Sequence, residues 1–98
     1  MMCQIRKERG NYAIHIPHAA DALKGQTVTA YVVRDNGEFK VERASIKRTR
    51  VGTVRLSLFN FRDVIRERNI VAEVTIADQD SVIVNLNPWE DEIWVAEA

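Results

Sequence analysis

Apolar and polar residues alternate along most of this chain, which is the period of a half-buried β-strand. The alternation is clearest at Tyr12, Ile14 and Ile16, and it returns forty-two residues later in residues 53–58. Glycine, proline and Asx residues interrupt the pattern where turns are needed. The pattern predicts strands over residues 3–7, 11–16, 26–34, 38–43, 45–50, 53–58, 69–76 and 81–86.

Two segments break the alternation and predict short helices. The first covers residues 18–24, where Pro17 suits a first helical turn and Gly25 suits a C-terminal stop. The second covers residues 61–68, where Asn60 can cap the N-terminus. Helices this short cannot cover the faces of a doubly wound sheet, so they favour a small barrel.

The two halves of the chain resemble each other. Residues 4–34 align with residues 46–76 without a gap, with Arg6 over Arg48 and Gly10 over Gly52. Each copy is too small to bury its own apolar face, whereas two copies related by a pseudo-two-fold axis can close one core. We therefore expect one domain over residues 1–98, with repeat one at 4–43, repeat two at 45–86 and a tail at 88–98. The expected class is mostly β (α+β), a pseudo-symmetric barrel with two short helices.

Charge is divided unevenly although its sum is zero. Residues 1–55 carry eleven Lys or Arg against five Asp or Glu, and residues 56–98 carry three against nine. The division predicts a basic surface separate from an acidic one. The lone Cys3 cannot form an internal disulfide, and no apolar run is long enough to cross a bilayer. We expect a cytoplasmic protein that does not enter membranes.

The segment RKERGNYAIHIPHAADALKGQTVTAYVVRDNGEFKVER carries an ordered set of motifs. A basic loop leads to Gly10-Asn11, an apolar strand ends in Ile16-Pro17, and a Gly-containing turn precedes the last strand. In this order and spacing the segment resembles the AbrB/MazE-type swapped-hairpin domain. The resemblance implies a barrel of two interleaved copies, normally from a homodimer. Here one chain would supply both copies, as in single-chain cradle-loop (RIFT-like) barrels.

The resemblance also implies a small DNA-binding regulator of AbrB or antitoxin type. Its basic loop corresponds to Arg6, Lys7, Arg9 and Asn11, with Arg48 and Arg50 as counterparts in the second copy. The sequence departs from the family pattern at His15, where arginine is usual before Ile-Pro. The second copy also lacks the Ile-Pro step. These departures concern base reading more than the fold.

Clustered cations define the expected contact surface for double-stranded DNA. Stacked by pseudo-symmetry, they would neutralise phosphates and release counterions. Base specificity would come from Asn11, His15, Thr53 or Arg55, and the sequence does not choose among them. The expected DNA-binding residues are Arg6, Lys7, Arg9, Asn11, Lys47, Arg48, Arg50 and Arg55. The same cations also fit an ordinary solvated surface.

The acidic tail offers an alternative function. Trp89, Ile93 and Trp94 stand among acidic residues, which suits a partner-binding peptide because tryptophan often anchors interfaces. MazE-like antitoxins bind their toxins through acidic C-terminal extensions, so the resemblance supports this reading. The other interpretation is an additional strand whose tryptophans cover the barrel. In the partner-binding interpretation the chain is a protein-binding module or inhibitor.

Enzyme chemistry has little support in the sequence. There is no nucleophile elbow and no glycine-rich phosphate loop. His15 and His18 lack the further ligands that a metal site requires. We therefore expect no enzyme, no cofactor and no metal, and a monomer or homodimer. A small-ligand cradle-loop barrel remains a further alternative.

Overall fold

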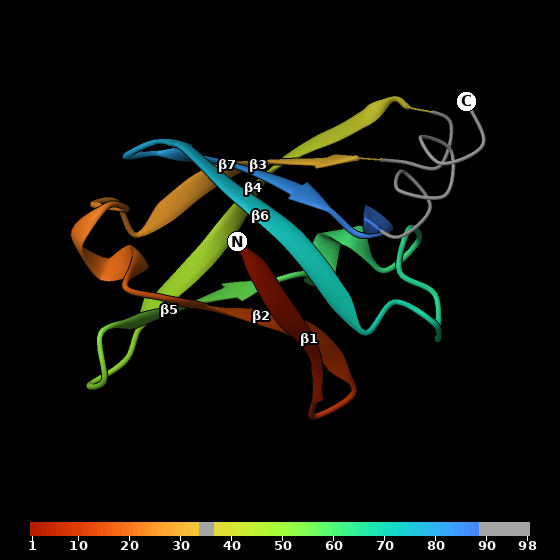
Figure 1. Cartoon of the computed structure of the whole chain (residues 1–98), viewed down its shortest axis with the longest axis horizontal. Helices are drawn as coiled ribbons and strands as arrows, with labels where there is room; N and C mark the ends of the chain where they lie inside the picture. Colours follow the sequence, from red (N-terminus) through yellow and green to blue (C-terminus); the bar gives the residue numbers. More distant parts are fainter. Residues whose placement is uncertain (34–36, 89–98) are drawn as a thin grey trace.

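The alternating segments form strands that close into one mixed barrel in the order β1-β2-β5-β4-β3-β7-β6 (Figure 1). The computed structural model describes residues 1–33 and 37–88, and within them the barrel has seven strands. β3 and β7 run parallel, and all other neighbouring pairs are antiparallel. The strands are β1 (Met2–Glu8), β2 (Asn11–Pro17), β3 (Thr27–Val33), β4 (Phe39–Arg48), β5 (Thr53–Ser57), β6 (Val71–Asp78) and β7 (Ser81–Asn85).

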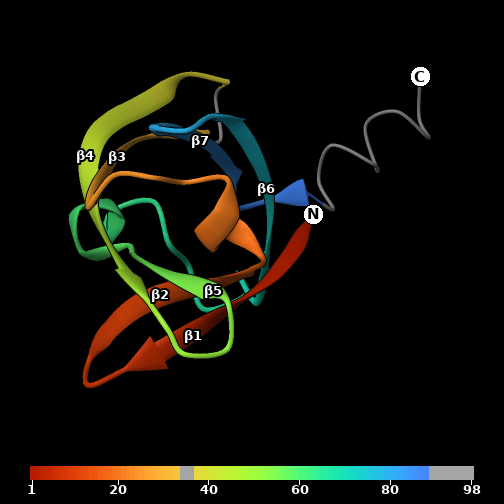
Figure 2. The same ribbon diagram turned by 90° about the vertical axis from the view of Figure 1, so that its left-hand side faces the viewer.

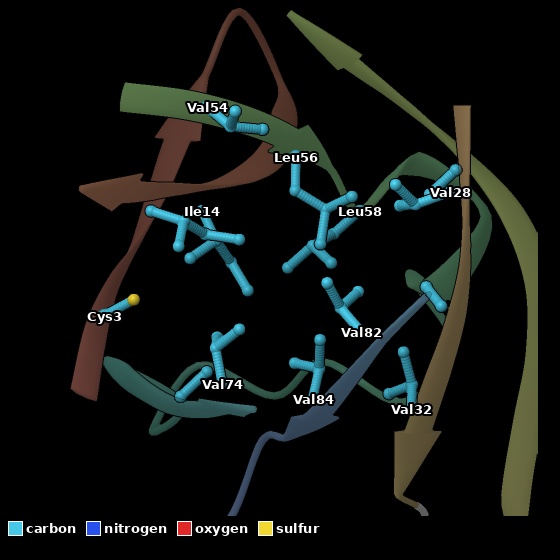
Figure 3. Close-up of a cluster of buried hydrophobic side chains, with 14 of the residues drawn as sticks. Cys3, Ile14, Val28, Val32, Val54, Leu56, Leu58, Val74, Val82 and Val84 are labelled. Carbon is cyan, nitrogen blue, oxygen red and sulfur yellow. The ribbon is translucent and has the colours of Figure 1, made fainter. Parts of the chain in front are cut away.

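The barrel interior holds the inward half of each alternating pattern (Figure 3). Ile14 and Leu56 are Cα partners in the β2–β5 ladder, and both are fully buried. Val32, Val74 and Val84 bring the opposite side of the barrel into the same cluster. A fully buried aliphatic side chain contributes about 1.5–3 kcal/mol relative to an exposed one. The alternation therefore supplies one shared core, as the sequence predicts.

β4 joins two parts of the barrel and corrects the sequence prediction of two separate strands there. Residues 38–43 and 45–50 were expected to form different strands, but one strand runs from Phe39 to Arg48. Its first part pairs with β3 and its second part pairs with β5. Ala44 lies between the two predicted strands, pairs with Val28 of β3 and is buried, and no glycine or proline interrupts the strand there. A continuous β4 thus links the two proposed repeats without a turn.

The prediction of two helices is wrong. Among the described residues the chain has only two 3-10 turns, η1 (Ala19–Asp21) and η2 (Phe59–Phe61), and no longer helix. By itself, a helix of this length is marginal in water, because it gains few hydrogen bonds against the cost of nucleation. Both turns instead place a fully buried side chain against the core, Ala19 from η1 and Phe61 from η2. Burial of these two residues therefore decides the local conformation.

The β1–β2 and β4–β5 hairpins have related ladders with a one-residue difference. Ile5 pairs with Ile14 in the first hairpin, and Ile46 pairs with Leu56 in the second. Ile14 and Leu56 are 42 residues apart, whereas Ile5 and Ile46 are 41 apart. The registers therefore match Arg6 with Lys47, not with Arg48 as the ungapped alignment has it. The duplication itself stays a prediction.

A longer loop accounts for the shift. The first hairpin turns through Arg9 and Gly10, whose φ values of 50° and 80° suit a two-residue type I′ turn. In the second hairpin Thr49 N donates to Thr53 O, which leaves three residues in the loop. Gly52 takes the positive φ of 74° that such a loop needs. Both hairpin tips lie on the lower side of the barrel in Figures 1 and 2.

Several expectations fall on residues 34–36 and 89–98, outside the described residues. They include part of the Gly-containing turn that was expected before the last strand of the first repeat, and the tail residues Trp89, Ile93 and Trp94. Within the described residues, no helix has the length and apolar character needed to cross a bilayer.

Candidate nucleic-acid interface

Three polar side chains share a row across neighbouring strands. Lys47 on β4 is the Cα partner of Arg55 on β5, and Arg55 is in turn the partner of His15 on β2. Their ladder neighbours Ile46, Leu56 and Ile14 contribute to the core. Because successive side chains of a strand point to opposite faces, the three polar residues belong to the outer face of the barrel.

Glu8, at the end of β1, joins this row through its carboxylate. Arg55 Nε donates to Glu8 Oε2 over 2.7 Å, and the His15 ring Nε2 lies 2.9 Å from Glu8 Oε1. The side chains of Glu8, His15 and Arg55 are 31%, 24% and 30% exposed, so each is largely covered. The hydrogen bonds from Arg55 and His15 hold the pKa of the Glu8 carboxyl below its ordinary value. Glu8 is therefore an ionised link between two strands.

A surface groove of about 560 Å³ opens beside this cluster. Its lining comes from both hairpins and consists of Glu8, Arg9, Asn11, Lys47 and Arg55. Half of the eight residues expected to bind DNA are thus brought together, although they are far apart in sequence. Arg9 and Asn11 come from the first hairpin, and Lys47 and Arg55 come from the second.

Arg48 has a different role from the one expected. Its Nη1 donates to the carbonyl of Gly25 over 3.0 Å, and its Nη2 donates to the carbonyl of Leu23. These carbonyls lie in the segment between η1 and β3, so Arg48 ties that segment to the end of β4. Both terminal nitrogens of its guanidinium are occupied by the protein itself.

The remaining expected residues lie outside the groove. Arg6 and Lys7 are exposed on β1, and Arg50 is exposed in the loop between β4 and β5. By register, Arg6 shares the outer face with Glu8, whereas Lys7 has the opposite orientation. None of the three forms a side-chain hydrogen bond or ion pair in the described part of the chain.

Sequence reasoning missed Glu8 as a member of the site. The signal was an acidic residue inside a basic run, which the net count of charges conceals. His15 was a candidate for base contact, and the structure instead places it against Glu8. The groove is therefore lined by three positive side chains, Arg9, Lys47 and Arg55, and by one negative side chain, Glu8.

The outer face of β3, β4, β6 and β7 has different chemistry. A smaller groove of about 160 Å³ is lined there by Tyr31, Phe39, Ala77 and Ile83. Phe39 is 53% exposed. No described residue that lines the first groove also lines this one, so one groove is charged and the other is apolar.

The described residues offer few groups suited to nucleophilic catalysis or metal binding. Cys3 is buried in the core, and this burial raises the pKa of its thiol. Among residues 1–33 and 37–88, no three His, Cys, Asp or Glu side chains cluster in a way that could hold a metal ion. A thiol of this kind is a poor nucleophile at neutral pH.

The chain matches no family model, no curated protein and no solved structure.

Proposed function

We propose that this chain is a small DNA-binding regulator of the AbrB or antitoxin type, with the groove face on the duplex. The observation that carries the proposal is the convergence of both hairpins on one open basic groove. Arg9, Lys47 and Arg55 supply the charge there, and Arg9 and Lys47 have no side-chain partner among the described residues. Cations that are free of protein contacts can meet phosphates without first breaking an internal bond.

The backbone at Arg9 gives further support. Arg9 has a φ of 50°, in the left-handed region that glycine, asparagine and aspartate prefer. Asn-Gly or Asp-Gly is the usual choice for this turn. An arginine at this position costs conformational energy, which suits a role for its side chain. The side chain lines the groove.

Salt dependence of DNA binding tests the proposal. Each phosphate contact contributes a slope of about −0.9 to the dependence of log K on log salt. We expect Lys47→Ala and Arg9→Ala each to make the slope shallower by about one such contact. Lys24→Ala is the matched control, because Lys24 is exposed but does not line the groove. Fluorescence anisotropy with a mixed-sequence duplex at several salt concentrations gives the slopes. Equal slopes for all four proteins would contradict the proposal.

A small anionic ligand is a second candidate for the same groove. Its volume of about 560 Å³ lies within the range of small-molecule sites. Two features favour DNA over such a ligand: the groove is open to the surface, and its lining is charged, whereas ligand sites are mostly apolar. The anisotropy assay separates the two candidates. Displacement of the duplex by micromolar mononucleotide favours the small ligand, and persistence of the duplex favours DNA.

A further inference from the structure

Arg55 is held at one nitrogen of its guanidinium and open at the others. Its Nε donates to Glu8, and this is its only side-chain hydrogen bond among the described residues. The two terminal nitrogens therefore remain available at the groove, which Arg55 lines. Arg48 has the opposite arrangement, with both terminal nitrogens donated to backbone carbonyls. Of these two arginines, only Arg55 can present a paired set of donors to a ligand.

Glu8 limits the orientations that Arg55 can adopt. The carboxylate is itself held by His15, and all three side chains are about two-thirds covered or more. Arg55 also has ladder partners on both sides, His15 on β2 and Lys47 on β4. A guanidinium fixed in this way loses less conformational entropy when it binds. The contact at Nε does not use the edge that carries the two terminal nitrogens, so this edge can donate to a ligand.

That edge matches one base better than the others. In the major groove guanine presents two adjacent acceptors, O6 and N7, to which arginine donates two parallel hydrogen bonds. Adenine presents a donor in place of O6, and cytosine also presents a donor. A phosphate can accept from the same edge, but Arg9 and Lys47 also line the groove and suit that role.

We infer that Arg55 reads a guanine in the major groove and that Glu8 is the positioning residue that aims it. The inference rests on the proposed function, since it names the base that the same groove recognises. Glu8 also repels phosphate, so its presence weakens binding to every sequence while favouring the one that satisfies Arg55. Glu8 therefore lowers the overall affinity for DNA and raises the selectivity for guanine.

The test compares two duplexes of equal length, one built from G·C pairs and one from A·T pairs, by anisotropy at one salt concentration. We expect the wild-type chain to bind the G·C duplex about tenfold more tightly, the value of one good bidentate contact. Arg55→Ala removes the paired donors and loses the preference. Glu8→Ala also loses the preference but binds the A·T duplex at least as tightly as wild type, which a merely unfolded variant could not do.

Two further variants sharpen the result. Glu8→Gln retains an oxygen that can accept from Arg55 Nε, so it keeps part of the preference that Glu8→Ala loses. Arg43→Lys, outside the groove, leaves the preference unchanged. Equal wild-type affinity for both duplexes overturns the inference and leaves DNA binding intact, as does a preference that survives in Arg55→Ala or Glu8→Ala. Binding to neither duplex overturns the proposed function as well.

Discussion

The two hairpins of the barrel share a ladder but differ in what their ends contact. In the β1–β2 hairpin the end pair is Glu8 with Asn11, and the Glu8 carboxylate reaches Arg55 of the other hairpin. At the matching position of the β4–β5 hairpin, the hydroxyls of Thr49 and Thr53 hydrogen-bond to each other. The end of the first hairpin thus bonds to the other hairpin, whereas the end of the second bonds within itself.

A second difference concerns the cations one position earlier. Lys7 and Arg48 match by register, yet Lys7 is exposed without a side-chain partner in the described chain, and Arg48 holds the segment after η1. Residues at matching positions of the two hairpins therefore have different contacts. The comparison teaches that a basic residue in a small barrel cannot be assigned to a ligand until its hydrogen bonds are known.

The largest loss of stability should come from substitutions in the core, where the two hairpins are most alike. Ile14→Ala and Leu56→Ala each remove a fully buried side chain from the centre of the β2–β5 ladder. We expect each to lower the free energy of unfolding by about 3 kcal/mol in urea titrations. Val51→Ala is the control, since Val51 is 80% exposed and should change stability by less than about 0.5 kcal/mol. A cost below about 1 kcal/mol for one of the buried pair would show that the hairpins do not share the core equally.

An intermediate effect should separate Arg48 from Lys7. Arg48→Ala removes hydrogen bonds to the carbonyls of Leu23 and Gly25, and we expect a loss of about 1.5 kcal/mol because the donor is charged. Lys7→Ala at the matching position should cost less than about 0.5 kcal/mol. Urea midpoints of the two variants provide the measurement. Equal losses would mean that the position on β4 has no special structural role.

The smallest effect concerns pH and is confined to the first hairpin. The pKa of Glu8 is lowered in the folded chain by Arg55 and His15, so its contribution to stability is present above the unfolded pKa. That contribution is lost as the pH falls through the lowered folded value, below about 4.5. Wild type should therefore lose more stability between pH 6 and pH 3 than Glu8→Gln. Parallel losses in thermal unfolding would exclude a stabilising role for the ionised carboxylate.

The strands could be predicted because their signal is local. The alternation around Ile14 and Leu56 locates β2 and β5 to within a residue or two, and the buried positions follow from it. The helices could not be predicted in the same way. Ala19 and Phe61 are drawn into the core, and that tertiary burial outweighs the capping signals at Pro17 and Asn60.

The candidate site, too, could be predicted only in part. Arg9, Asn11, Lys47 and Arg55 were recognisable as a polar set, but their meeting in one groove depends on how the two hairpins pair. The single extra loop residue before Gly52 shifts the register, and this shift places Lys47 on the outer face beside Arg55. An ungapped alignment of the two halves does not show this register shift.

The amino-acid sequence by itself determined that this chain is a mostly β domain with a core built from alternating apolar residues, because strand periodicity is a property of neighbouring residues. Only the tertiary structure decided which cations line the groove and which hold other segments of the chain. Arg48 and Arg55 are the same residue type, seven positions apart in the chain, and their partners come from segments distant in sequence. Hydrogen bonds across a closed barrel depend on strand order and register, and neither is encoded in the residues beside them.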